Sequence, residues 1–275
     1  MQYKLHVKVT TKEQIEAVLQ KSEIVSRIYI PYRIFAESDK NVRIPDGIEM
    51  YLCSPYVFRN RDIDNIDRVL LQYQFDGYLC CDHEFFGYIN GSEHSDKDRK
   101  LVLDSGMYIL NHEALDLYIH NSSLKISGFY NSFELNRKEL DKLRDAVCKH
   151  GIDNVISSYV VYGRIPMMIS ANCILKTSAR CRKTSGFTYI KDRMGVDFPV
   201  FNDCCSCLNV IYNSVPLSLH GYFDELYFKG DVRIDLTDET AEQSAGIIDY
   251  FGFYDPAKKL PYSDYTTGHY KRGVE

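Results

Sequence analysis

Short β-rich runs recur along this 275-residue chain at nearly regular intervals. The segments between most of them have apolar residues at a period near 3.6, which is typical of strands alternating with helices. The first seven runs begin 20 to 30 residues apart, whereas the eighth begins 231 − 154 = 77 residues after the seventh. The expected strands are Tyr3–Val9, Arg27–Ile30, Gly47–Leu52, Asp76–Cys80, Lys100–Leu103, Leu124–Ser127, Asn154–Tyr162 and Asp231–Leu236.

Such alternation predicts parallel strands, because each helix returns the chain to the same end of the sheet. Eight such units in about 250 residues match the size of a (β/α)8 barrel. We therefore expect an α/β, TIM-like barrel, and an open doubly wound sheet is the alternative. Residues 1–275 are expected to form a single barrel domain, and residues 163–230 a cysteine-rich, basic insertion between strands 7 and 8. That insertion would lie over the mouth where barrel enzymes carry their active sites.

Helix starts are visible in the sequence. Thr10 and Glu13 predict a capping box, and Asn136 with Glu139 predicts another. The final helix is expected over Thr237–Phe251, where apolar residues recur on one face.

Composition limits the class of protein. Apolar residues make up 45% and charged residues 26%, which is ordinary for a folded protein. The net charge of 33 − 38 = −5 argues against a protein that coats nucleic acid with its whole surface. Lys4 and Lys8 interrupt the apolar stretch that a signal peptide would need, and no window has the 18 apolar residues of a membrane span. We expect no membrane span and a cytoplasmic location.

Five of the nine cysteines lie within residues 173–207. Cys173, Cys181, Cys204 and Cys207 have the spacing of a four-sulfur metal site, with Cys205 as a fifth thiol between the last two. Four thiolates suit either Zn²⁺ or an iron–sulfur cluster, and spacing does not separate the two. Free thiols in an ordinary loop are the alternative.

The segment from Arg164 to Arg193 contains seven cations and a single acid, Asp192, for a local charge of +6. The rest of the chain then sums to −11. We expect these cations to lower the pKa of neighbouring thiols and to attract an anionic substrate, either a carboxylate or a phosphate backbone. A solvated charged loop is the alternative.

Polar side chains follow several predicted strands, at the end that forms the mouth of a barrel. His83, Asp104 and Glu134 are the candidates for catalytic proton transfer. Their alternative is a solvated or structural role.

Three further residues are candidates for binding substrate: Arg164, Asn136 and Tyr162. The guanidinium of Arg164 can hold a carboxylate at two points. Asn136 is equally well placed to cap a helix.

Several segments, taken together, resemble the peptidase U32 family. They are Ser132-Phe133-Glu134-Leu135-Asn136, Val161-Tyr162-Gly163-Arg164-Ile165-Pro166-Met167-Met168, Ser170-Ala171-Asn172-Cys173, Tyr189-Ile190-Lys191-Asp192-Arg193, Phe198-Pro199-Val200 and Thr267-Gly268-His269-Tyr270-Lys271-Arg272-Gly273-Val274.

This resemblance implies a barrel that carries a [4Fe-4S] cluster. Members of the family were labelled collagenase-like proteases, and the better-understood ones take part in oxygen-independent hydroxylation of tRNA, ribosomal RNA or the ubiquinone ring, with prephenate as oxygen donor for some. By resemblance, the cluster ligands are Cys173, Cys181, Cys204 and Cys207, and Cys205 is the thiol that could displace one of them.

The chain lacks two features of many members, the His-Gly-x-x-Cys-x-x-x-Ser-Gly-x-Cys form and the Ala-Pro-Ala-Gly opening strand. It therefore resembles the second barrel of the long members, which implies a partner U32 subunit or domain. The implied substrate is RNA or a small anionic molecule such as prephenate.

Two other functions remain open from the sequence. A peptidase is what the family label suggests, but the chain has neither a Gly-x-Ser-x-Gly elbow nor a His-Glu-x-x-His helix. A non-catalytic RNA-binding module held in shape by zinc or iron–sulfur is the other alternative.

Overall fold

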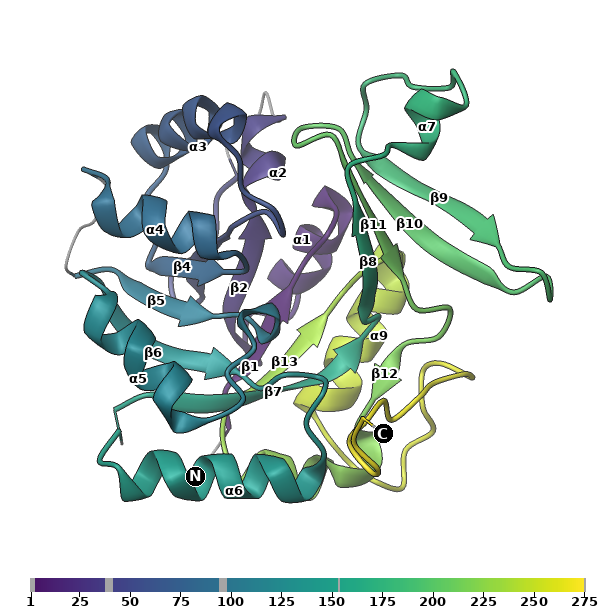
Figure 1. The fold of residues 1–275 in the computed structure, drawn as a ribbon. Helices are drawn as coiled ribbons and strands as arrows, with labels where there is room; N and C mark the ends of the chain where they lie inside the picture. The colour runs from purple at the N-terminus through teal and green to yellow at the C-terminus, as the bar shows by residue number, and fades with distance from the viewer. Residues whose placement is uncertain (1–2, 38–41, 94–97, 153, 275) are drawn as a thin grey trace.

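Eight parallel strands form a closed barrel, as the spacing of the β-rich runs predicts (Figure 1). The computed structural model describes residues 3–37, 42–93, 98–152 and 154–274. Strand β13 pairs with both β7 and β1 and so closes the sheet. Around the barrel the strands are β1 (Leu5–Lys8), β2 (Val25–Pro31), β3 (Glu49–Cys53), β4 (Gly77–Cys80), β5 (Lys100–Leu103), β6 (Lys125–Tyr130), β7 (Ile156–Gly163) and β13 (Val232–Asp235). Each of the eight expected strands overlaps one of these.

Helices return the chain between successive strands and pack their apolar faces on the outside of the barrel. In α3, for example, Ile66, Val69 and Leu70 are buried. The helices are α1 (Lys12–Leu19), α2 (Tyr32–Ala36), α3 (Asn60–Gln72), α4 (His83–Gly91), α5 (His112–Asn121), α6 (Arg137–Lys149) and α9 (Ala241–Gly252), with a 3-10 turn, η1 (Ser105–Met107), before α5.

Two predicted helix starts are wrong by a few residues. Helix α1 is capped by Thr11 and Gln14, one position later than Thr10 and Glu13. The buried Gln14 side chain accepts from the backbone N–H groups of residues 10 and 11 and also donates to the carbonyl oxygen of Thr237, which an ionised glutamate cannot do. Helix α9 begins at Ala241 rather than at residue 237, because Thr240 provides the cap. The predicted cap at Asn136 is confirmed.

The insertion between β7 and β13 contains a second sheet. Its four antiparallel strands lie in the order β8 (Pro166–Ser170), β11 (Leu208–Tyr212), β10 (Asp197–Asp203) and β9 (Gly186–Lys191), with the short helix α7 (Ile174–Thr177) between β8 and β9. Figure 1 shows this sheet standing at one side of the barrel. The chain then returns to β13 through β12 (Leu217–Ser218), η2 (His220–Tyr222) and α8 (Phe223–Leu226).

The inside of the barrel combines aromatic rings with charged groups. Tyr29, Tyr51, Leu79 and Tyr130 are part of an interior apolar cluster that is separate from the main core under the helices. Charged side chains of β1 and β13 project among these rings, and the guanidinium of Arg233 lies 3.8 Å from the ring centre of Tyr130. No helix of the described residues is both long and apolar enough to cross a membrane.

Candidate functional site

A buried ion cluster lies at the end of the barrel formed by the carboxyl ends of the strands. Asp104 follows β5 and accepts hydrogen bonds from Lys8 Nζ (2.9 Å to Oδ2) and Arg233 Nη2 (2.7 Å to Oδ1). Asp235 contacts Arg233 from the other side, with its Oδ2 2.9 Å from Nη2. The side chains of Arg233, Asp104 and Lys8 are only 0%, 2% and 10% exposed. Three strands, β1, β5 and β13, therefore meet through charges that are held away from water.

The electrostatics keep Asp104, Lys8 and Arg233 ionised. Burial by itself would raise the pKa of Asp104, but Arg233 and Lys8 hold it well below its usual range. Burial opposes the charge on Lys8 as well, and the carboxylate of Asp104 raises the pKa of that lysine well above its usual value. The result is a fixed set of charges, which is the kind of environment that stabilises charge in a bound substrate.

A cavity of about 340 Å³ lies against this cluster. The insertion contributes Ile165, Pro166 and Ile169 to the wall of this cavity. Part of the insertion therefore lies at the mouth of the barrel. The remaining lining residues are Lys8, Tyr56, Cys81, Asp82, His83, Asp104, Ser105, Gly106, Tyr108, Ser132, Phe133, Glu134 and Asp235. This volume is within the usual range for a small-molecule site.

All three acid–base candidates line this one cavity. Asp104 is at its buried side, whereas Glu134 is exposed. His83 is the first residue of α4, and its Nδ1 is 2.8 Å from Tyr118 Oη, with the two rings stacked. The structure therefore brings together His83, Asp104 and Glu134, which are far apart in the sequence.

The binding candidates Arg164 and Tyr162 line a different cavity, of about 400 Å³, on the outer side of β7. Arg164 Nε is 2.7 Å from Asp238 Oδ1, and the same guanidinium donates to the carbonyl oxygens of Asn213 and Ser214. The guanidinium therefore holds one carboxylate oxygen and two backbone carbonyl oxygens of its own chain. Tyr162 is buried and donates to Glu239 Oε1 at 2.9 Å.

Asn136 serves as a helix cap. Its Oδ1 accepts from the backbone N–H groups of Lys138 and Glu139 at 3.0 and 3.2 Å, and the Glu139 carboxylate accepts from the Asn136 N–H at 2.9 Å. Of the two roles the sequence left open, the structure accounts for the cap.

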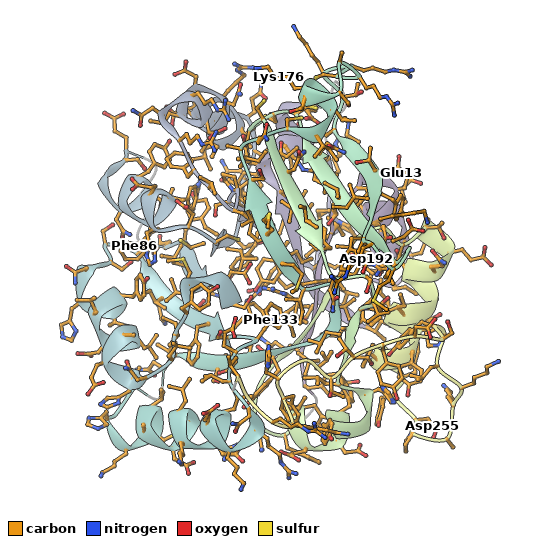
Figure 2. All side chains as sticks on the ribbon, turned by 45° about the vertical axis from the view of Figure 1, so that its right-hand side comes forward. Glu13, Phe86, Phe133, Lys176, Asp192 and Asp255 are labelled. Carbon is orange, nitrogen blue, oxygen red and sulfur yellow. The ribbon has the colours of Figure 1, made fainter. Side chains whose placement is uncertain are left out.

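The cysteines of the insertion gather at one end of its sheet. Cys204 and Cys207 bracket the four-residue turn between β10 and β11. Cys173 is the buried N-cap residue of α7, with Asn209 Nδ2 4.0 Å from its sulfur, and Cys181 is exposed in the loop after that helix. In Figure 2, Lys176 of α7 marks this end, and Phe133 of the mouth cavity lies toward the opposite end of the sheet.

The cysteine end of the insertion rests on α2 and α3. Ser206 is buried within the turn, and its Oγ is 2.7 Å from Tyr32 Oη and donates to Asp62 Oδ1 at 3.1 Å. Cys205 faces the same helices, with its sulfur 4.0 Å from Asn65 Nδ2. Cys205 is thus directed toward the helices of the barrel, whereas Cys204 is the residue that the resemblance implies as a cluster ligand.

The expectation that nearby cations lower the thiol pKa is wrong for Cys204. Partial burial, together with the neighbouring sulfurs of Cys181 and Cys173, raises the pKa of this thiol to about 11. The cations Lys176, Arg180, Arg182 and Lys183 are exposed, so water screens them. Cys181 and Cys173 are close enough to Cys204 to affect its pKa.

The donor chemistry of these thiols suits a thiophilic metal or an iron–sulfur cluster, since all four are free and three are at least partly accessible. Among the described residues, however, no three His, Cys, Asp or Glu side chains are positioned to hold a metal ion. Binding would therefore require the loops to draw their sulfurs closer together.

Backbone strain is concentrated in these loops. Ala179, Lys183 and Cys207 have φ values of 56°, 55° and 53°, and within the described chain the remaining non-glycine residue with positive φ is Tyr108. Left-handed conformations are costly for residues with a Cβ and tend to occur at functional sites.

Sequence reasoning missed Lys8, Arg233 and Asp235, although a signal for them was present. Arg233 and Asp235 alternate with apolar residues in β13, as His6 and Lys8 do in β1. Along a barrel strand, the apolar residues that pack on the helices alternate with residues that point into the barrel. The charged residues of β1 and β13 are therefore expected inside it. Comparison with protein-family models finds none that matches the chain, and comparison with curated proteins finds no relative.

Proposed function

We propose that this chain is a U32-type barrel protein that binds a [4Fe-4S] cluster at the cysteine end of its insertion and takes part in oxygen-independent hydroxylation. The observation that carries this proposal is that Cys173, Cys181 and Cys204, from three separate segments, gather at one end of the insertion. Cys207 completes the set from the same turn as Cys204. The bound cluster would supply electron transfer.

The mouth cavity is the proposed substrate site. Lys8 offers a buried positive charge beside the rings of Tyr56 and Phe133, and its Nζ lies 4.8 Å from the centre of the Tyr56 ring. The cavity has the volume for a small aromatic molecule or a single nucleotide. Glu134 and His83 are positioned at the accessible side for proton transfer.

The exposed basic run favours RNA among the proposed substrates. Lys176, Arg180, Arg182 and Lys183 lie around the exposed Cys181 on the outside of the insertion. Such a surface attracts a phosphate backbone. If a second U32 subunit completes the reaction, the basic surface around Cys181 can help to hold the RNA that both subunits would bind.

The proposal is tested by anaerobic purification followed by a visible spectrum and by iron, sulfide and zinc determination. A broad visible absorption with equal amounts of iron and sulfide supports it. Cys204→Ala and Cys207→Ala should lose the absorption, and Cys148→Ala and Cys205→Ala are matched controls that should keep it.

Two outcomes contradict the proposal. A colourless protein with one zinc per chain would leave a structural thiolate site without redox chemistry. Protein that takes up neither metal, even when reconstituted with iron and sulfide, would remove the ligand assignment.

A further inference from the structure

Two cysteines outside the insertion face each other beside the mouth cavity, and one of them, Cys81, is part of its wall. Cys53 is the last residue of β3, Cys81 directly follows the neighbouring strand β4, and their Sγ atoms are 3.6 Å apart. They are 3% and 7% exposed, and Cys81 lines the cavity. None of the roles described above uses either thiol.

The surroundings make the two thiols unequal. Cys81 Sγ is 3.2 Å from Asp104 Oδ2, the same oxygen that accepts from Lys8 Nζ, and its single S–H proton can be donated either to this oxygen or to Cys53 Sγ. The hydrogen bond from Cys81 lowers the pKa of Cys53 despite burial, and Lys8 lowers it further. Burial raises the pKa of Cys81, and the adjacent sulfur of Cys53 adds to this. Cys53 is therefore the better thiolate nucleophile, and Cys81 retains its proton.

We propose that Cys53 and Cys81 form a redox-active dithiol, which a small hydroperoxide oxidises to a disulfide. This inference does not rest on the proposed function, because it involves neither the insertion nor a cluster.

The chemistry proceeds in two balanced steps. The Cys53 thiolate attacks the terminal oxygen of the hydroperoxide; an S–O bond forms, the O–O bond breaks, and the leaving alkoxide or hydroxide takes a proton from solvent. The Cys81 sulfur then attacks the sulfenic acid on Cys53; an S–S bond forms and the S–O bond breaks. The departing hydroxide combines with the proton of Cys81 as water. The dithiol loses two electrons, and the peroxide gains them.

Closure requires little movement. The sulfurs must approach from 3.6 Å to about 2.0 Å, the length of a disulfide bond. Once the bond forms, Cys81 no longer donates to Asp104, so oxidation would alter the wall of the mouth cavity itself.

Cys80 provides a matched control. It adjoins Cys81 but is fully buried in the main core under the helices, and its sulfur donates to the carbonyl oxygen of Asp82 at 3.2 Å. Burial raises the pKa of Cys80, which leaves it a poor nucleophile.

The experiment treats the full chain with hydrogen peroxide, alkylates the free thiols after unfolding, and maps each cysteine by mass spectrometry. We expect a peptide that links Cys53 to Cys81 and that dithiothreitol separates. Cys81→Ser should accumulate a sulfenic acid on Cys53, trapped by dimedone, whereas Cys80→Ala should form the disulfide like the unchanged protein.

The proposal is overturned if Cys53 and Cys81 both stay alkylatable while the exposed Cys148 is oxidised. It is also overturned if Cys53 proceeds to sulfinic acid without any linked peptide. The mapping of the unchanged chain decides these outcomes even if a variant fails to fold.

Discussion

The barrel mouth and the cysteine end of the insertion are built in opposite ways. At the mouth, Asp104 is enclosed by Lys8 and Arg233, and all three side chains are almost inaccessible to water. At the insertion, Cys181 is exposed, Cys204 and Cys207 are partly exposed, and their loops contain residues in left-handed conformations. The charged groups at the mouth are already paired with one another, whereas on the proposed function the thiols would be joined only by a bound cluster.

The largest effect that we expect comes from breaking the ion cluster at the mouth. Asp104→Asn leaves the buried charges of Lys8 and Arg233 without their common partner, which should lower the free energy of unfolding by about 3–5 kcal/mol. Urea unfolding of both proteins measures this difference in the free energy of unfolding. The control is Asp116→Asn, which removes a half-exposed partner of His120 and should change stability by no more than about 0.5 kcal/mol. A loss of unfolding free energy below about 1 kcal/mol for Asp104→Asn would mean that Lys8 and Arg233 are not buried against this carboxylate as described.

Acid should weaken the same cluster. The pKa of Asp104 is depressed in the folded state, so its stabilisation is fully present above the unfolded pKa of about 3.9 and is lost as the pH falls toward the folded value. We expect the stability difference between the unchanged chain and Asp104→Asn to be constant from about pH 7 to pH 5 and to shrink below about pH 4. A difference that grew on acidification would have the wrong sign.

A smaller effect distinguishes a cap from a ligand. Asn136→Ala should cost about 1 kcal/mol because α6 loses its N-cap, and Asn136→Asp should cost almost nothing because aspartate caps equally well. Thermal unfolding gives both values. If Asn136→Asp retained stability but abolished substrate binding, the residue would belong to the site after all.

The smallest effect on stability is expected at the insertion. Cys181→Ser changes an exposed side chain, so the free energy of unfolding should shift by no more than about 0.5 kcal/mol, while iron bound after anaerobic reconstitution should fall. Unfolding in urea and iron determination on the same preparation check the two parts. A large loss of stability in the metal-free protein would show that this loop is as tightly built as the mouth.

The sequence predicted the barrel well because its signal is repeated eight times. The Lys100–Leu103 strand has the predicted bounds, and the other seven overlap the observed strands. Helix starts were less certain, since Glu13 and Gln14 fit a capping box equally well until tertiary contacts select one of them. For Gln14 those contacts include the carbonyl oxygen of Thr237, more than 200 residues away.

The site was predicted only in part. Asp104, His83 and Glu134 were placed at the barrel mouth, where they line the cavity, because each follows a predicted strand. Lys8 and Arg233 were missed because charged residues within a strand normally face water, and nothing local shows that these two neutralise a distant carboxylate. The role of Arg164 was equally hidden, since its partner Asp238 is 74 residues away.

Amide hydrogen exchange tests the contrast between the two regions most directly. The full chain would be compared after anaerobic reconstitution with iron and sulfide and after treatment with a chelator. We predict that exchange slows in peptides covering residues 173–207 when iron is bound, and stays unchanged in peptides that contain Asp104 or Arg233. Unchanged exchange across residues 173–207 in protein that has taken up iron and sulfide would contradict the account, because the metal would then be held elsewhere.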